Sequence, residues 1–304
     1  MTRLMALCLG VTLLLSALTT AIVLGQRRSF PNGASLVFSM GHDSYNLYAV
    51  QPDSGFGNNF HTLFMPGHVF ADRYVTGVDC APDSHSLIFW YIYLYRLDLA
   101  DDHLTPLILG QGLSQESVWS PDGTRIAYID NVLDRQPREI LLIDADGSNQ
   151  MQVTHNEDQE TSLSWSPDGS QIVFTYSRGS KQGLGVVDVD SGQETTLYEA
   201  AARIRGVSWS PNGEEIAFDM QQTGHSAIYK LRLEDAALTR LTDANGENIA
   251  ARWSPDGTLI SYSSRDSSGH YELYVMNADG SNPYMVFPTI ENEDVFNQCW
   301  LNPT

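Results

Sequence analysis

The chain has 304 residues, 42% of them hydrophobic and 10% aromatic, which excludes a disordered acidic chain and predicts a folded protein with a sizeable core. Asp and Glu outnumber Lys and Arg by 37 to 17, so the formal net charge is −20. Because neutralising phosphates requires clustered Lys and Arg, this charge argues against nucleic-acid binding and against docking on an anionic membrane surface.

The first predicted element is an uncharged, mostly apolar segment at residues 4–24. About 20 such residues suffice to cross the core of a bilayer, whereas the apolar part of a signal peptide usually has about 7–15. We predict that residues 1–25 form a membrane anchor. The alternatives are a signal peptide cleaved before Gln26 and a buried core helix. The rest of the chain is then expected outside the cytoplasm, in the periplasm or at the cell surface.

A five-residue motif, Trp-Ser-Pro-Asp/Asn-Gly, occurs four times after this segment, and each copy is followed by an aliphatic-x-aromatic pair. Two degenerate copies precede these four, at Pro31-Asn32-Gly33 and Pro82-Asp83-Ser84. The repeat positions that we expect to be structural are Trp119, Trp165, Trp209, Trp253, Pro121, Pro167, Pro211, Pro255, Asp122, Asp168 and Asp256. The prolines recur at intervals of 39 to 51 residues, and such a period is typical of stacked or radial repeats.

Each unit reads as short alternating strands joined by tight turns. Proline ends the strand before it because it cannot donate to a ladder, and Asp-Gly supplies the turn that follows. Four strands with tight turns need about 40–45 residues, which is the size of one propeller blade. The motif Trp and the aromatic residue after it are expected to fill the wedge between neighbouring blades.

The two ends of the repeat region complement each other. The copy at Pro31 has no strand before it, and the segment from Val295 to Trp300 reads as a first strand with no second strand after it. We therefore predict an all-β fold over residues 26–304: a six-bladed β-propeller of four-stranded blades, closed by the C-terminal strand that contains Trp300. Closure would hide the edge strands at both ends of the ring.

The Trp-Ser-Pro-Asp-Gly copies and the stretch from Leu273 to Asn282 resemble the TolB-type, WD-like propeller repeat. The resemblance covers residues 29–304. It implies a propeller fold and a location in the cell envelope.

The motifs of common enzymes are absent, including Gly-x-Ser-x-Gly, the Walker loop, His-Glu-x-x-His and Cys-x-x-Cys. His42, His225 and His270 fall between the second and third strands of their units, where we expect solvent-facing turn residues rather than a metal or general-base site. The Asp144–Gly147 and Asn277–Gly280 turns read as hairpins rather than calcium loops, since the spacing of acids ending in Glu is missing. We expect neither a metal nor a cofactor.

The segment from Pro52 to Tyr74 is the longest insertion between motif copies and is rich in aromatic and His residues. Exposed aromatic residues mark contact surfaces, so a partner-binding loop is one interpretation and local packing is the other. The candidate binding residues are Phe56, Phe60, His61, Phe64 and His68.

Two cysteines lie in the repeat region. Cys80 takes the Trp position of the second unit, and Cys299 immediately precedes Trp300. Because successive strand residues point to opposite faces, the two side chains can meet across adjoining blades. In an oxidising compartment they would form a disulfide, and the alternative is a pair of free buried thiols.

We expect a non-catalytic binding or scaffold propeller, displayed outside the cytoplasm, that binds a protein or peptide on a rim or at the channel mouth. The alternative is a hydrolase or lyase on a bare propeller, acting on saccharides or lactones with a metal at the channel mouth. The enzyme interpretation predicts inward-facing His and acidic side chains near the axis.

Overall fold

A computed structural model describes residues 35–41, 46–50, 60–63, 76–90, 93–108, 116–131, 137–243, 246–287 and 294–301. The chain divides into two compact units, Met1–Pro31 and Asn32–Thr304. The predicted anchor at residues 1–25 lies outside the described residues. Within the described ranges every regular element is a strand, and no helix there is long and apolar enough to cross a membrane. The all-β prediction is confirmed.

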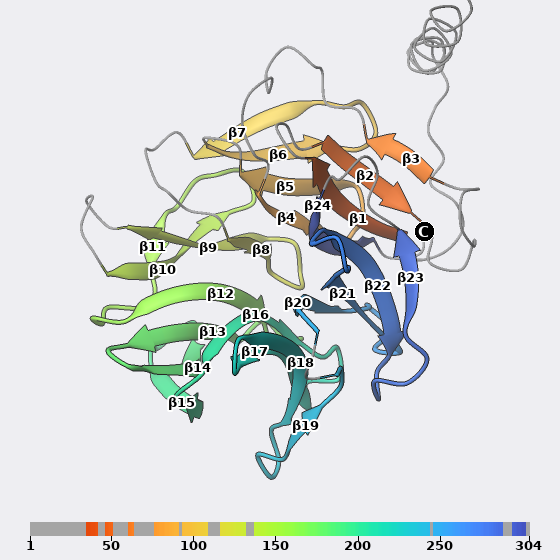
Figure 1. Ribbon diagram of the computed structural model, residues 1–304. Coiled ribbons are helices and arrows are strands. Elements are labelled where there is room, and N and C mark those ends of the chain that lie inside the picture. Colours follow the sequence, from red (N-terminus) through yellow and green to blue (C-terminus); the bar gives the residue numbers. More distant parts are fainter. Residues whose placement is uncertain are drawn as a thin grey trace, which may run out of the picture. The chain divides into compact units, whose positions relative to one another are not determined.

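Each of the first three sheet units consists of four strands (Figure 1). Unit 1 has the order β24-β1-β2-β3, with β1 (Ser35–Gly41), β2 (Asn46–Val50), β3 (Phe60–Leu63) and β24 (Asp294–Leu301). Unit 2 contains β4 (Thr76–Cys80), β5 (Ser86–Trp90), β6 (Leu94–Asp98) and β7 (Leu104–Ile108). Unit 3 contains β8 (Ser117–Trp119), β9 (Arg125–Asn131), β10 (Arg138–Asp144) and β11 (Met151–Gln152).

The other three units repeat this antiparallel order. Unit 4 contains β12 (Gln159–Trp165), β13 (Gln171–Arg178), β14 (Lys181–Asp188) and β15 (Glu194–Ala200). Unit 5 contains β16 (Arg203–Trp209), β17 (Glu215–Gln222), β18 (His225–Arg232) and β19 (Leu238–Arg240). Unit 6 contains β20 (Asn248–Trp253), β21 (Leu259–Arg265), β22 (Tyr271–Asn277) and β23 (Tyr284–Phe287). One parallel pairing, Arg138 with Gln159, joins units 3 and 4 into an eight-stranded sheet.

The strands that begin the units lie at the centre of the arrangement. β4, β8, β12, β16, β20 and β24 each contact the next one in this series, and β24 contacts β4. The last strands of the units, among them β7, β15, β19 and β23, lie at the periphery (Figure 1). The ends of the central strands are therefore brought together from positions far apart in the sequence.

The motif folds locally into a hydrogen-bonded turn. In unit 4, Ser166 Oγ accepts a hydrogen bond from the Gln171 amide at 2.9 Å and donates to Asp168 Oδ1 at 2.6 Å. Gly169 takes a φ of +72°, in the left-handed region that glycine adopts without a steric penalty. The same serine bonds recur at Ser120, Ser210 and Ser254.

These turns pack on one another between units. A Cβ built on Gly169 would lie 3.8 Å from Pro121 Cδ of the preceding motif, and the same contact joins Gly213 to Pro167 at 3.9 Å. The proline that ends one central strand is thus the surface on which the next turn rests. The motif couples neighbouring units as well as turning the chain.

The hydrophobic core lies between the units. Trp165 of unit 4 belongs to one buried cluster with Val118, Ile129 and Ile140 of unit 3. The aromatic residue that follows the motif is also enclosed, since Phe174 is 2% exposed and Phe218 is fully buried. Each large side chain therefore fills the wedge between sheets, where it buries most apolar area.

Substitution of Ser166 by alanine tests the motif turn. The variant leaves the Gln171 amide without its acceptor and removes the bond to Asp168, so the free energy of unfolding should fall by about 1–2 kcal/mol. Urea denaturation gives the measurement. Ser170→Ala is the matched control, because Ser170 is exposed and bonds only at the surface side of the same turn. Equal stability of the two variants would contradict the role assigned to Ser166.

Candidate binding site at the centre of the sheets

The central strands end at a pocket of about 240 Å³, here called the central pocket. Its wall contains residues from β4, β8, β12, β16, β20 and β24 and from the motif turns that follow them. The large side chains that line it are Trp119, Trp165, Trp209, Trp253, Trp300, Pro82, Pro121, Pro211 and Pro255. The tryptophans are 6–8% exposed, so most of each ring is packed into the wall. Asp79 and Arg252 are the charged side chains among the described lining residues.

At several junctions the side chain of the residue before the motif Trp position joins neighbouring central strands. Asp79 Oδ2 accepts the Trp119 amide at 2.7 Å, Ser164 Oγ accepts the Trp209 amide at 3.0 Å, and Ser208 Oγ accepts the Trp253 amide at 3.1 Å. Each bond runs from one unit to the next. These side chains therefore supply the hydrogen bonds that the central strands do not make as a sheet.

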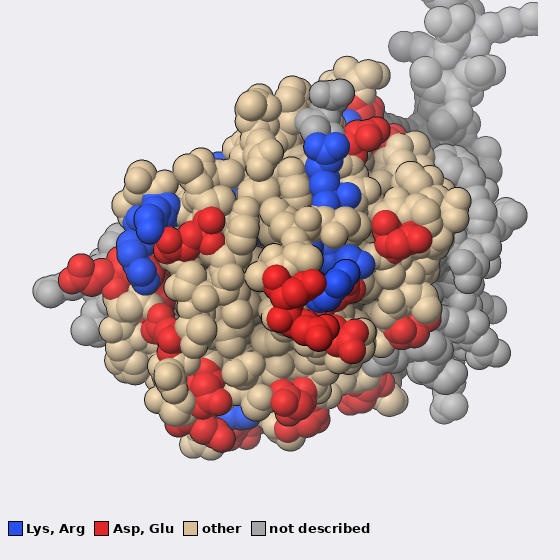
Figure 2. All heavy atoms as spheres, turned by 90° about the horizontal axis from the view of Figure 1, so that it is seen from below, with Lys and Arg blue, Asp and Glu red and all other residues tan. Residues whose placement is uncertain are grey.

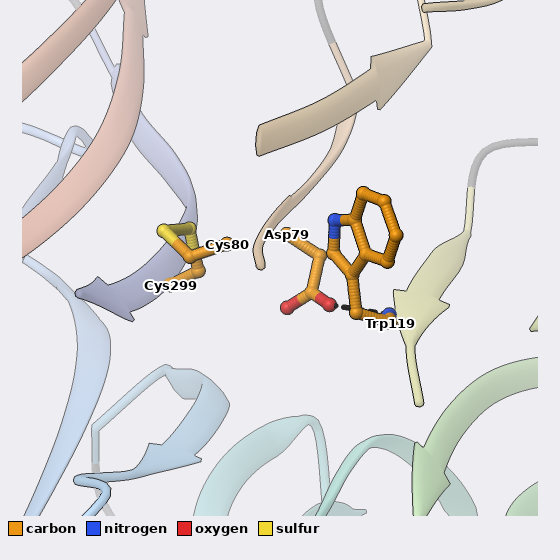
Figure 3. Close-up of a disulfide and its surroundings, with 4 residues drawn as sticks. All are labelled: Asp79, Cys80, Trp119 and Cys299. Carbon is orange, nitrogen blue, oxygen red and sulfur yellow. Dashed lines mark hydrogen bonds between the residues drawn. A yellow bond between two sulfur atoms is a disulfide. The ribbon is translucent and has the colours of Figure 1, made fainter. Parts of the chain in front are cut away.

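The disulfide occupies the corresponding place between units 1 and 2. Cys299 precedes Trp300, and Cys80 takes the Trp position of β4; the two are bonded with their Cα atoms 5.6 Å apart. Figure 3 shows this bond on one side of Asp79 and the Asp79–Trp119 hydrogen bond on the other. A covalent bond thus stands where other units use an amide and a polar side chain.

A bulge precedes this position in several central strands. The register shifts between Thr76 and Asp79, between Arg205 and Ser208, and between Ile249 and Arg252. Inside these shifts Gly77, Gly206 and Ala250 each have a φ of 58°. Bulges bend a strand and re-aim its side chains, which explains how alternate residues near the pocket reach the neighbouring strand.

Asp79, Ser164 and Ser208 accept a tryptophan amide from the next unit, whereas Arg252 in the equivalent position is a hydrogen-bond donor. Its Nη1 donates to the Val207 carbonyl at 3.2 Å and to the Ala251 carbonyl at 3.2 Å, and its Nη2 lies 4.0 Å from Glu116 Oε2. Glu116 directly precedes β8 of unit 3, whereas Arg252 belongs to unit 6 and Val207 to unit 5. The guanidinium therefore connects central strands that are not neighbours.

Burial disfavours the charged forms of the two acids near this guanidinium. Burial raises the pKa of Asp79 to about 7, against the opposing effects of the Trp119 amide and Arg252. Burial also raises the pKa of Glu116, again opposed by Arg252. The centre of an otherwise acidic protein thus places the Arg252 guanidinium near two carboxyls whose pKa values are raised by burial.

The residues proposed from the insertion are only partly described. Phe60 and His61 lie in β3, where they pair with Val50 and Ala49 of β2. Their side chains, and all of Phe56, Phe64 and His68, lie outside the described residues. The partner-binding prediction for this segment stays a prediction.

The histidines expected in turns do not line the central pocket in the part of the chain that the structure describes. His225 is exposed at the start of β18, and His270 Nδ1 lies 3.6 Å from Asp294 Oδ1. His42 lies outside the described residues. Within the described ranges, no group of three or more His, Cys, Asp or Glu residues is arranged to hold a metal ion.

Sequence reasoning missed Arg252 and Glu116. The sequence signal for Arg252 is its position: it is the basic residue directly before a motif Trp, where the other units have Asp, Val, Ser or Cys. Nothing in the sequence marks Glu116, because its role depends on which central strands face each other.

Antiparallel four-stranded units whose first strands surround a pocket define a β-propeller protein. The chain belongs to the TolB β-propeller family, since the family model described as "TolB beta propeller domain" matches residues 123–295. The predicted family is confirmed.

Individual relatives agree with this assignment. The chain is 35% identical over 75 residues to the Tol-Pal system protein TolB of Haemophilus influenzae (strain PittGG), a stretch that covers 24% of this chain and 18% of that protein. The solved structure of TolB from Acinetobacter baumannii is similar with a TM-score of 0.76 and 18% identity, over 88% of this chain and 66% of that one. Putative TolB from Agrobacterium tumefaciens has a TM-score of 0.69 and 21% identity, over 90% and 99% of the two chains. The match to the Haemophilus protein therefore spans less than a fifth of its length, and these two structures show the fold alone.

The disulfide is open to a direct chemical test. Digestion of the unreduced, alkylated protein should release one linked peptide that contains Cys80 and Cys299. The bond closes a sequence separation of 219 residues, so reduction should lower the free energy of unfolding by about 2–5 kcal/mol. Recovery of two separately alkylated cysteine peptides would contradict the pairing.

Substitution of Asp79 by asparagine tests the buried carboxyl. Because its pKa is raised on folding, the stability that the neutral form contributes is complete below about pH 4 and is lost as the pH rises through about 7. Asn is neutral throughout and keeps an acceptor for the Trp119 amide. The free energy of unfolding of Asp79→Asn minus that of the wild type, measured by urea denaturation, should therefore be larger at pH 8 than at pH 5. Asp83→Asn, on an exposed turn of the same unit, controls for the loss of a surface charge. A stability difference that does not change with pH would contradict the account of Asp79.

Proposed function

We propose that this chain is a non-catalytic binding module outside the cytoplasm, and that its propeller holds a segment of a protein partner at the central pocket. The proposal includes six four-stranded blades, units 1–6, closed by β24. It also includes residues 1–25 as the segment that tethers residues 26–304 to the cytoplasmic membrane. The relative from Haemophilus is described as a Tol-Pal system protein, which supports an envelope location and a protein partner.

The observation that carries the proposal is the composition of the central pocket. Its largest lining side chains are tryptophans, prolines and one arginine, and Trp and Arg are among the residue types that most often dominate binding energy at protein interfaces. All six central strands contribute to its wall, so the lining is held by the whole fold rather than by one loop. Such a preformed wall needs little ordering when a partner binds.

The arginine indicates what part of a partner fits there. A guanidinium presents several donors in one plane and matches carboxylate or carbonyl oxygens. Arg252 already donates to the Val207 carbonyl and faces Glu116, so its position is held before a partner arrives. We expect an oxygen-bearing group of the partner to bind at Arg252 while apolar side chains contact the tryptophans and prolines.

Capture from solubilised envelope, with partners identified by mass spectrometry, tests this function. The full chain should retain a specific protein, and Arg252→Met should weaken that retention by about tenfold or more, as expected for a central interface arginine. Arg240→Met is the matched control, because Arg240 is exposed on β19 and is not among the residues that line the pocket.

The fold of both variants is checked by thermal unfolding, so that a loss of capture reports on the site. Retention of the same partner by the wild type and Arg252→Met at equal affinity would contradict the proposal. Loss of capture in Arg240→Met alone would also contradict it, because it would move the contact to the outer strands.

A further inference from the structure

A lysine of unit 5 rests on the tryptophan of unit 6. Lys230 Nζ lies 5.9 Å from the centre of the Trp253 ring, 3.1 Å from Glu215 Oε1, and donates to the Ala278 carbonyl at 3.2 Å. A cation close to an aromatic ring is attracted by its quadrupole. The ring, the carboxylate and the carbonyl together form a binding site for one cationic group, here called the cation seat.

The same arrangement recurs in part at two other junctions. Arg125 of unit 3 covers the Trp165 ring of unit 4, with Cζ 5.4 Å from the ring centre. Arg96 of unit 2 donates to the Ala145 carbonyl of unit 3 at 3.2 Å, as Lys230 does to Ala278. The fold thus places cations between successive units.

At the junction between units 4 and 5 the tryptophan is present, but a valine replaces the lysine. Val186 pairs with Val173 as Lys230 pairs with Ala217, so Val186 holds the position of Lys230 relative to Trp209. Leu233 holds the position of Ala278, since each follows by two residues the partner of the motif isoleucine.

A groove of about 420 Å³ lies at this junction, between β14 and β15 of unit 4 and the Trp209 and Leu233 region of unit 5. Val186, Gln171, Asp188, Trp209 and Leu233 all line it. Gln171 takes the place of Glu215, because both directly precede the motif isoleucine. The short side chain of Val186 therefore leaves a groove where a lysine side chain lies one junction further on.

Asp188 supplies the negative charge that Gln171 does not. Its Oδ1 accepts the Ser191 amide at 2.9 Å and the Ser191 hydroxyl at 2.6 Å, and these bonds lower the pKa of the carboxyl. The side chain stays ionised at neutral pH. Figure 2, seen from below Figure 1, where β15 and β19 lie, shows acidic side chains in several groups and basic ones in fewer.

We propose that this groove binds the side chain of a lysine or arginine from a protein partner. The inserted cation would lie against Trp209 and Asp188 and near the Leu233 carbonyl, reproducing the seat of Lys230. The groove is lined mainly by the outer strands of unit 4 and carries the Asp188 carboxylate. The central pocket is lined by the central strands and carries the Arg252 guanidinium. The two sites share no described lining residue except Trp209, and this proposal stands independently of the proposed function.

The test uses the full chain, with its tryptophans labelled with ¹⁵N, and follows the indole N–H signal of Trp209 by NMR. The signal is assigned from the spectrum of Trp209→Phe. The probe is N-acetyl-lysine methylamide, and its neutral counterpart is N-acetyl-norleucine methylamide. We expect a saturable shift with the lysine probe at a dissociation constant of about 10 mM, the range for a ligand of this size. We expect less than about a tenth of that shift with norleucine, because the site recognises the charge.

Two substitutions separate binding at the groove from binding elsewhere. Val186→Lys should abolish the shift, because the protein's own cation would then occupy the seat. Val186→Thr, of similar volume, should retain it. Asp188→Asn should weaken binding at least threefold while keeping the oxygen that accepts from Ser191, and it serves as the second variant if Val186→Lys does not fold.

The absence of a saturable shift in the wild type would overturn the proposal. An equal shift with norleucine would overturn it as well, because recognition would not depend on charge. An undiminished response in Asp188→Asn would do the same. If tetramethylammonium shifted Trp209 and the lysine probe did not, the occupant would be a small organic cation and not a protein side chain.

Discussion

The central strands of this protein lie side by side without forming a sheet, and each must be joined to the next by a side chain. At four junctions between the described central strands the side chain before the motif tryptophan position performs this task, and at the other two the indole N–H of Trp165 or Trp300 donates to the carbonyl of Val118 or Arg252. Asp79, Ser164 and Ser208 accept the backbone amide of the next unit's tryptophan. A buried amide without an acceptor costs free energy, so these bonds hold the wall of the central pocket together. Between Cys299 and Cys80 the same junction is covalent.

One residue before a motif tryptophan has a different role, and it lies at the central pocket. Arg252 stands where the other units have Asp, Val, Ser or Cys, and its guanidinium reaches Val207 and Glu116. The groove beside Trp209 has another origin. Val186, like Leu142 and Val275 at the same register in units 3 and 6, is aliphatic, whereas Lys230 covers the tryptophan ring at the next junction.

The sequence predicted the large features well. The motif spacing, the alternating strand patterns and the Asp-Gly turns predicted an all-β propeller of the TolB type, and that class and family are confirmed. The neighbouring places of Cys80 and Cys299 relative to the motif were also sufficient to suggest their pairing.

What the sequence did not indicate depends on distances between units. The approach of Arg252 to Glu116 requires knowledge of which central strands are opposed, and motif spacing does not contain that information. The groove beside Trp209 depends on the length of a single side chain, Val186, and on the alignment of third strands across a junction. The raised pKa of Asp79 likewise follows from burial, which an acidic residue in a strand does not reveal on its own.

Photo-crosslinking tests most directly whether the central pocket is the binding surface. p-Benzoylphenylalanine would replace Pro255, which lines the pocket, or Leu238, which is 38% exposed on the outer strand β19. With each variant in its native envelope, irradiation should attach a partner protein from position 255 and not from position 238. Crosslinks from position 238 alone, or equal yields from both, would contradict binding at the pocket.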